Sequence, residues 1–392
     1  MHARQIVQRF IEAQLWQMHG ARRRVLIDAI GALIGGHRLS LTRLGRGMLG
    51  EGTLKAAIKR VDRLIGNERI EQEARLSAAV LLARMCALGV PLVIAVDWSA
   101  AAPGGRFVEL RAAVSFLGMG RALTVYQQVY PLAQLGSACA ERALLEQLHH
   151  WVRPGSEITV ITDAGFRRPW FARVEQLGWS WIGRIRRGVK LSRDGCAWEA
   201  AEAWFAHATR RPQRWQDCLL TRKAAWPCAL VLYRHAQRAR KTYRCPGHGS
   251  SAKAAKEARV SAAEPWLLAH SPKLNGHRPD EIVAMYALRM HIEQCFRDAK
   301  SSTFGMGFEI GRSRCALRIH ALLLIATLAA FVLWHIGQLA ETEGLHRRFK
   351  ATTRPHRELS FISLAFLLCQ LPHFPLSPHA CICLCRRIGA PT

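Results

Sequence analysis

Two largely aliphatic runs, each followed at once by an aspartate, constrain the fold of this chain more than any other feature. The first is Pro91–Val96, followed by Asp97, and the second is Glu157–Thr162, followed by Asp163. Runs of this kind are typical of strands buried on both faces. Ligands of open α/β sheets bind beyond the carboxyl ends of such strands, so the pattern predicts two strand-end carboxylates facing one crevice. Taken singly, either aspartate is better explained as a turn or helix-capping residue.

The segments around these runs predict an ordered series of strands and helices. Alternating or aliphatic patterns predict strands at 107–116, 122–130 and 179–185, and helical spacing predicts helices at 139–152 and 167–177. With the two aliphatic runs, the order becomes three strands, a helix, a strand, a helix and a strand. That is the order of elements in an RNase H-like α/β core.

Charge indicates the kind of partner. The 392 residues include 56 Lys and Arg against 28 Asp and Glu, a formal net charge of +28. A basic excess of this size favours a polyanion, with DNA as the first candidate. An anionic membrane surface is the alternative, but the basic residues are spread along the whole chain and do not flank an apolar span.

The sequence gives little indication of export or of membrane insertion. The N-terminus has no basic-then-apolar signal pattern, and the 14 uncharged residues Ala321–Trp334 are too few for a span. Twelve cysteines without a pairing rhythm favour reduced thiols. We therefore expect a cytoplasmic protein with no membrane association.

The segment from Tyr286 to Lys300 predicts a helix with one chemical edge. Tyr286, Arg289, Glu293, Arg297 and Lys300 are spaced by 3, 4, 4 and 3 positions, which places them within an arc of about 80°. An apolar face at Met285, Leu288, Ile292, Phe296 and Ala299 would dock this helix on a core. A solvated face of Glu/Arg pairs is the alternative interpretation of the charges.

The spacing Tyr286-x2-Arg289-x3-Glu293-x6-Lys300 resembles the YREK signature of insertion-sequence transposases of the IS-four family, which carry a DDE triad. Asp97, Asp163 and Glu293 match that triad in order and context. The resemblance covers most of the chain. It implies an RNase H-like catalytic core interrupted by a mostly β insertion, with helical N-terminal DNA-binding and helical C-terminal segments.

Three clustered carboxylates repel one another unless cations lie between them. Two Mg²⁺ ions, for which Mn²⁺ can substitute, would relieve that repulsion and clamp the oxygens of a phosphodiester displacement. Metal-assisted phosphodiester chemistry follows from the residues. The resemblance further implies cleavage at terminal inverted repeats through a hairpin, joining of 3′ ends to target DNA, and a homodimer in a synaptic complex.

The resemblance also implies roles for other residues. Tyr286, Arg289 and Lys300 would contact DNA phosphates. Trp266, in the run Glu264-Pro-Trp266, would stack on a flipped base, although a tryptophan buried in the core explains it almost as well.

Residues 1–75 predict helices and a second DNA contact. Thr53 is the expected N-cap of an amphipathic helix whose outer face carries Lys55, Lys59, Arg60 and Arg63. A shorter helix from Leu41 to Met48, weakened by Gly45 and Gly47, would complete a helix-turn-helix pair. The run from Ile58 to Asn67 resembles the DNA-end-binding region of the same family, and a solvated basic face is the alternative.

These features predict five parts: a DNA-end-binding domain at 1–75, the first part of the core at 76–185, a basic and mostly β insertion at 186–275, a core helix at 276–315, and a helical segment with a divergent tail at 316–392. In the insertion, thirteen Lys and Arg stand against two acidic residues between Thr209 and Val260. The last part would form the dimer contact.

Two other functions fit part of the sequence. A sequence-specific DNA-binding protein without catalysis accounts for the charge and the helix-turn-helix, but not for the three acidic residues. A metal-dependent nuclease of the same fold accounts for those residues, and strand transfer would separate it from a transposase. A membrane protein fits least.

Overall fold

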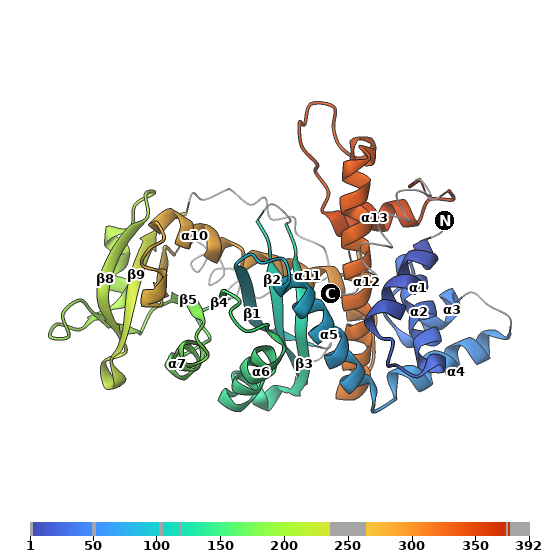
Figure 1. Ribbon diagram of the computed structural model, residues 1–392, viewed down its shortest axis with the longest axis horizontal. Helices are drawn as coiled ribbons and strands as arrows, with labels where there is room; N and C mark the ends of the chain where they lie inside the picture. Colours follow the sequence, from blue (N-terminus) through green and yellow to red (C-terminus); the bar gives the residue numbers. More distant parts are fainter. Residues whose placement is uncertain are drawn as a thin grey trace, which may run out of the picture. The chain divides into compact units, whose positions relative to one another are not determined.

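Strands and helices alternate in a mixed α/β arrangement, shown in Figure 1. The computed structural model describes residues 3–48, 52–101, 105–117, 120–235, 264–303, 305–373 and 375–376. The chain divides into two units. Unit 1 comprises Met1–Glu157 and Met290–Thr392, and unit 2 comprises Ile158–Arg289.

The N-terminal part of unit 1 is helical, as predicted. Its helices are α1 (Ala3–Gln14), α2 (Gly20–Ile34), α3 (Leu41–Gly47), α4 (Leu54–Ile65) and α5 (Ile70–Cys86). The backbone N–H of Ala56 donates to Thr53 Oγ1 at 3.2 Å, which confirms the predicted N-cap of α4.

The glycines of α3 allow close packing. A Cβ at Gly45 would lie 2.7 Å from Cγ1 of Ile58, and one at Gly47 would lie 2.3 Å from the His37 ring. The sequence predicted that both glycines weaken this helix. The structure shows that Gly45 lets α3 lie directly against α4, so its cost in helix propensity is offset by packing.

Three antiparallel strands follow in unit 1, in the order β3-β2-β1. They are β1 (Leu92–Ala100), β2 (Phe107–Ser115) and β3 (Ala122–Pro131). Helix α6 (Ala138–Trp151) comes next in the chain, and Trp98 Nε1 donates to Glu141 Oε1 on it at 3.1 Å. Asp97 was predicted at the end of its strand. This was wrong, because β1 continues to Ala100 with Asp97 paired opposite Arg111.

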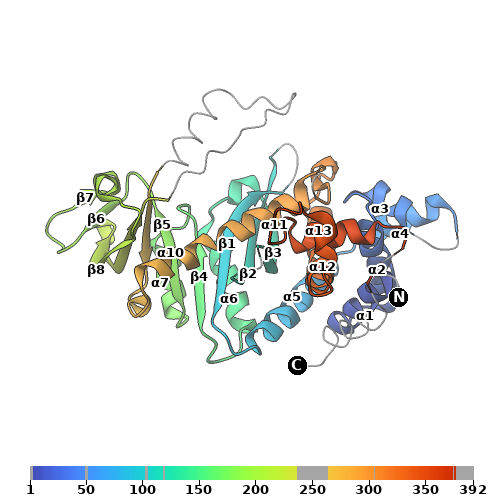
Figure 2. The same cartoon turned by 90° about the horizontal axis from the view of Figure 1, so that it is seen from above.

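Unit 1 is completed by helices from the C-terminal part of the chain: α11 (Met290–Lys300), α12 (Ala316–Thr342) and α13 (Phe361–Cys369). Helix α11 crosses β1, β2 and β3 (Figure 2). Among the described residues, α12 is the one helix long and apolar enough to cross a membrane. It packs against α1, α2, α4, α5, α13 and β3, and 72% of its most apolar window is buried, which supports the predicted core helix.

Unit 2 contains one sheet in the order β4-β5-β10-β9-β8-β6-β7. Strands β4 and β5 are parallel, and the other pairs are antiparallel. Its strands are β4 (Ile158–Thr162), β5 (Ser180–Ile185), β6 (Lys190–Ser192), β7 (Glu199–Ala200), β8 (Gln213–Leu220), β9 (Trp226–Tyr233) and β10 (Trp266–His270). Its helices are α7 (Arg168–Gln176), α8 (Ala201–Trp204) and α10 (Pro279–Ala287).

Close aromatic packing holds α7 on this sheet. Phe171 stacks on Trp181 of β5 with ring centroids 4.2 Å apart. A Cβ at Gly183 would lie 2.5 Å from Cζ of Phe171, so glycine is needed beneath the ring. This packing fixes α7 against β5, and β5 in turn pairs with β4.

The predicted order of three strands, a helix, a strand, a helix and a strand is confirmed as β1, β2, β3, α6, β4, α7 and β5. Strands β9 and β10 lie within 186–275, the part predicted to be mostly β. The basic residues of this part from Arg238 to Arg259 lie outside the described residues.

Gly337 offers a test of the α12–α13 contact. A Cβ there would lie 2.2 Å from the backbone oxygen of Phe361, so Gly337→Ala must displace α13. We expect a loss of about 1–3 kcal/mol in the free energy of unfolding, measured by chemical denaturation. Gly20→Ala is the control, because nothing lies within 4 Å of its Cβ position. Equal stability of both variants would contradict this contact.

Candidate active site

Asp97 shares one face of the unit 1 sheet with three polar residues. Side chains alternate along a strand, so Asp97 and Ser99 project from the same face of β1. In the antiparallel register Asp97 lies opposite Arg111 and Ser99 lies opposite Glu109 on β2. Helix α11 covers this face, because its Phe296 and Lys300 contact Arg111 and Ser99.

A buried ion pair lies at the centre of this face. Arg111 contacts Glu109 Oε1 through Nε at 2.6 Å and through a terminal nitrogen at 2.5 Å, and both side chains are almost fully buried. The Arg111 guanidinium also lies 4.6 Å from the centre of the Phe296 ring. A charge buried this deeply is stable only when it is paired. Because Phe296 of α11 packs on the paired Arg111, the ion pair also fixes the position of α11 on the sheet.

Lys300 is held beside the ion pair. Its Nζ donates to Ser99 Oγ at 2.6 Å and lies 5.0 Å from the centre of the Phe296 ring. Burial lowers the pKa of the Lys300 ammonium and Arg111 lowers it further, whereas Glu109 and Asp97 raise it. Lys300 therefore sits on the Asp97 face of β1, among two carboxylates and a guanidinium.

Glu293 is placed by the same helix. It precedes Lys300 by seven residues, about two helical turns, so both side chains project from the same side of α11. Two contacts from β3 and the residue before it anchor this helix. Arg121 Nε contacts Asp298 Oδ2 at 2.6 Å, and Cys295 Sγ donates to the Ala122 carbonyl at 3.0 Å.

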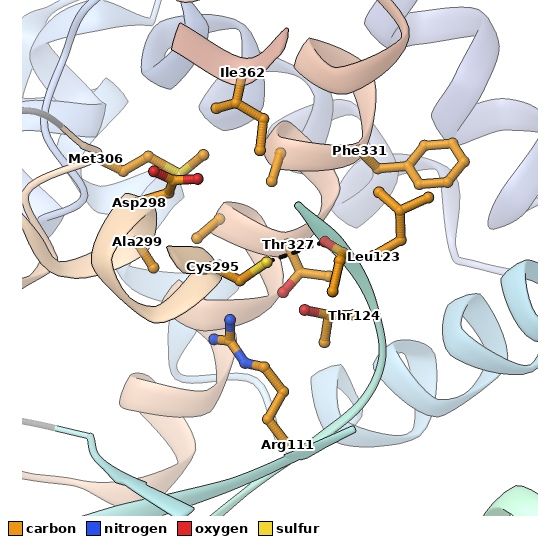
Figure 3. A pocket seen from close by; sticks show the side chains of 13 residues that line it. Arg111, Leu123, Thr124, Cys295, Asp298, Ala299, Met306, Thr327, Phe331 and Ile362 are labelled. Carbon is orange, nitrogen blue, oxygen red and sulfur yellow. Dashed lines mark hydrogen bonds between the residues drawn. The ribbon is translucent and has the colours of Figure 1, made fainter. Parts of the chain in front are cut away.

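The interior behind α11 is closed to substrate. Burial raises the pKa of the Asp298 carboxyl, while Arg121 lowers it, and burial raises the pKa of Cys295 to about 11. Figure 3 shows both side chains, with Arg111, around a cavity of about 30 Å³ bounded also by α12 and α13. That volume holds a water molecule and no nucleotide. DNA therefore does not enter this cavity.

Unit 2 carries the second predicted aspartate. Asp163 directly follows β4, as predicted, and its Oδ1 accepts a hydrogen bond from the backbone N–H of Gly165 at 2.8 Å. This turn holds the carboxylate at the carboxyl end of a parallel strand.

Tyr286 lies in an aromatic and cationic cluster of unit 2. It is buried, and its ring centroid lies 5.1 Å from that of the half-buried Trp266. Burial raises the pKa of the Tyr286 hydroxyl, Arg289 and Arg184 lower it, and Asp163 raises it. The phenol thus lies within electrostatic reach of Asp163 and two guanidinium groups.

The predicted continuous helix from Tyr286 to Lys300 is wrong. Helix α10 ends at Ala287, Leu288 and Arg289 form a turn, and α11 begins at Met290. The two units also divide after Arg289. Tyr286 and Arg289 consequently belong with Asp163 in unit 2, and Glu293 and Lys300 belong with Asp97 in unit 1. The predicted apolar face is confirmed at Leu288, Ile292, Phe296 and Ala299, all of which are buried.

The basic face of α4 is largely in solvent. Lys55, Lys59 and Arg63 are exposed and Arg60 is partly buried. The opposite side of the helix is buried at Ala57, Val61, Leu64 and Ile65, while Leu54 in its first turn is 53% exposed. Unit 1 therefore presents these cations where they can meet a phosphate backbone.

Comparison with known proteins identifies the family. The family described as Transposase DDE domain matches residues 123–332, which is more than half of the chain and includes Asp163 and Glu293. The chain belongs to the transposase DDE domain family. It is a metal-dependent enzyme that cleaves DNA and transfers DNA strands.

Two further comparisons add little to the transposase assignment. One similar structure is a cryo-EM structure of the piggyBac transposase synaptic complex with hairpin DNA. The match covers 98% of this chain and 82% of the piggyBac chain, with 13% sequence identity and a TM-score of 0.42. At that TM-score the likeness does not establish a common fold. A search of curated proteins finds no match.

The metal required by the transposase family has donors of the right chemistry. The predicted ligands Asp97, Asp163 and Glu293 would supply carboxylate oxygens, the donors that Mg²⁺ prefers. Within the described part of the chain, however, no three His, Cys, Asp or Glu side chains form a group that could hold a metal. Unit 1 carries two of the three carboxylates and unit 2 carries the other.

Several residues of the candidate site were not predicted. Glu109 and Arg111 are charges of opposite sign at positions i and i+2 of an apolar strand, a pattern that could have indicated a buried pair. Ser99 and Arg184 carry no such signal. Arg184, on β5, donates to the Glu264 carbonyl at 3.4 Å, and burial lowers its pKa.

The buried pair of the transposase can be tested by stability. Glu109→Gln leaves the Arg111 charge unpaired, and we expect a loss of about 3–5 kcal/mol in the free energy of unfolding. Replacing both residues, Glu109→Leu with Arg111→Met, should recover most of that loss, because no buried charge remains. Denaturant titrations of the two variants measure the difference. A double variant as unstable as Glu109→Gln would show that the pair does more than balance its own charges.

Proposed function

We propose that this transposase cuts DNA at the terminal inverted repeats of its own element and joins the 3′ ends to target DNA. The observation that carries the proposal is the shared face of β1 and α11, where Asp97 lies with the Lys300 ammonium in a chain of the transposase DDE domain family. Such a site combines a carboxylate for a metal with a cation for a phosphate. A nuclease would stop after cleavage, so strand transfer distinguishes the two.

Asp97, Asp163 and Glu293 would together hold two Mg²⁺ ions, for which Mn²⁺ can substitute. Bound ions supply Lewis-acid stabilisation of the attacking and leaving oxygens. The protein's own part is to hold the DNA strand in line: Lys300 and Arg289 by charge, and Tyr286 by its hydroxyl. Arg184 reinforces this role, because it places a second guanidinium near Tyr286.

The YREK spacing and the DDE order support a finer assignment to the IS-four family. Within it, the chain resembles the hairpin-forming transposase of the insertion sequence flanking transposon ten. On that basis the reaction passes through a hairpin, with Trp266 stacking on a flipped base. The half-buried position of Trp266, in an aromatic cluster with Tyr233, His235 and Tyr286, supports this role.

The same resemblance supports an RNase H-like core formed by 76–185 and 276–315, with 186–275 as an insertion and 316–392 as the dimer-forming segment. We propose that residues 1–75 bind the DNA end through Lys55, Lys59, Arg60 and Arg63. The working form would be a homodimer in a synaptic complex, in the cytoplasm.

Substitution of the carboxylates tests the proposed site. Asp97→Ala and Glu293→Gln should each reduce cleavage and strand transfer by about 10³-fold, roughly 4 kcal/mol of transition-state stabilisation. The assay uses purified protein, Mg²⁺ and a duplex carrying the repeats that flank the gene. Asp280→Asn, which changes an exposed carboxylate on α10, is the control and should retain activity. Equal product from Asp97→Ala and the control would remove the assigned site.

Lys300 gives a separate test that needs no metal. Lys300→Ala should weaken binding of the DNA end and reduce the slope of log K against log salt by about 1, because one phosphate contact is lost. Ser99→Ala is the matched control, since it removes the hydrogen-bond acceptor of Lys300 and keeps the charge. Lys300 has no phosphate role if the two variants bind DNA alike at every salt concentration.

A further inference from the structure

The chain between α12 and α13 forms a basic loop that none of the assigned sites uses. It comprises residues 345–358 and begins with the short helix η6 (Leu345–Phe349). The loop contains five Lys and Arg residues and one acidic residue, Glu358. Figure 1 shows it leaving the end of α12 before the chain returns as α13.

Some of the charged side chains of this loop make contacts that hold it in place. Arg357 Nε contacts Glu341 Oε1 on α12 at 2.9 Å, and its guanidinium lies 3.9 Å from the centre of the Phe361 ring. The backbone N–H of Ala351 donates to Glu358 Oε2 at 2.8 Å, and Lys350 Nζ donates to the Arg354 carbonyl. These contacts give the second half of the loop, from Lys350 to Glu358, a defined shape.

Two of its arginines take no part in the bracing. Arg347 and Arg348 are both exposed. Neither guanidinium makes a hydrogen bond or ion pair with any residue in the described part of the chain. Adjacent, unpaired guanidinium groups on a braced loop retain their full capacity to bind an anion with two donors each.

Helix α12 sets the distance between this loop and the basic face of α4. Arg318, near the start of α12, pairs with Asp62 on α4, whereas the loop follows the other end of α12. A helix of 27 residues is about 40 Å long. That length corresponds to roughly 12 base pairs of B-DNA, so the loop and α4 cannot contact the same phosphates.

We infer that residues 345–358 form a second DNA-binding surface of unit 1, in which Arg347 and Arg348 bind backbone phosphates of double-stranded DNA. The contact carries no sequence information and adds affinity over a longer duplex. The partner follows from the family, whose members act on DNA, and from the unpaired positive charge. The inference does not depend on Asp97, Asp163 or Glu293.

Salt-dependent binding tests the surface. Arg347→Ala with Arg348→Ala should reduce the slope of log K against log salt by about 2 on a duplex of roughly 40 base pairs, measured by fluorescence anisotropy without divalent metal. The matched control is Arg142→Ala with Arg153→Ala, which removes the same charge from exposed positions on or next to α6. That control should keep the wild-type slope.

Two more comparisons sharpen the result. Arg347→Lys with Arg348→Lys should keep most of the slope, because the charge remains. On a duplex of roughly 10 base pairs, too short to reach both surfaces, the alanine double variant should lose much less affinity than on the long duplex. Because metal is absent and the carboxylates are intact, a failed cleavage assay would not affect this test.

An unchanged slope in the alanine double variant would overturn the inference and leave a solvated loop. A fall in oligomer mass by light scattering, without a change in DNA affinity, would also overturn it and assign the loop to contact between copies of the chain. Thermal unfolding of the variant should match the wild type, since neither side chain is packed.

Discussion

The packing of α11 on the sheet of unit 1 is the interaction on which the site depends. Helix α11 carries Glu293 and Lys300, and a buried ion pair beneath an aromatic ring holds it on the sheet. Glu109 and Arg111 are desolvated, so their pairing is stable in one geometry and costly in any other. Phe296 lies over Arg111, and α11 is thereby fixed in rotation. Glu293 and Lys300 take their positions from that rotation.

The charges of the two units are arranged in complementary ways. In unit 1, Asp97, Glu109, Arg111 and Lys300 form a set with equal numbers of positive and negative groups, so a single added ion or phosphate changes its balance. In unit 2, Asp163 stands with the guanidinium groups of Arg184 and Arg289 near one phenol, an excess of positive charge suited to a phosphate. The proposed catalysis combines these two properties, metal binding by carboxylates and strand positioning by cations.

Most of the element order was predictable because hydrophobic period and length are properties of local sequence. The end of β1 was not, since a carboxylate does not stop strand pairing and Trp98–Ala100 can extend the ladder. Nor was the turn at Leu288–Arg289, because both residues favour helix and only packing decides the break. Of the candidate site, the acidic residues were predicted from strand ends and spacing, and the structure places Asp163, but not Asp97, at the end of a strand. Ser99 was missed because only a tertiary contact gives it a role, whereas the charges of the Glu109–Arg111 pair on an apolar strand were a sequence signal that was overlooked.

Anomalous scattering from Mn²⁺, in crystals of the transposase bound to one DNA end, tests most directly whether the three carboxylates act together. We expect manganese peaks at about 2.1 Å from carboxylate oxygens of Asp97, Asp163 and Glu293. Peaks held by other side chains, with these three carboxylates free of metal, would contradict it.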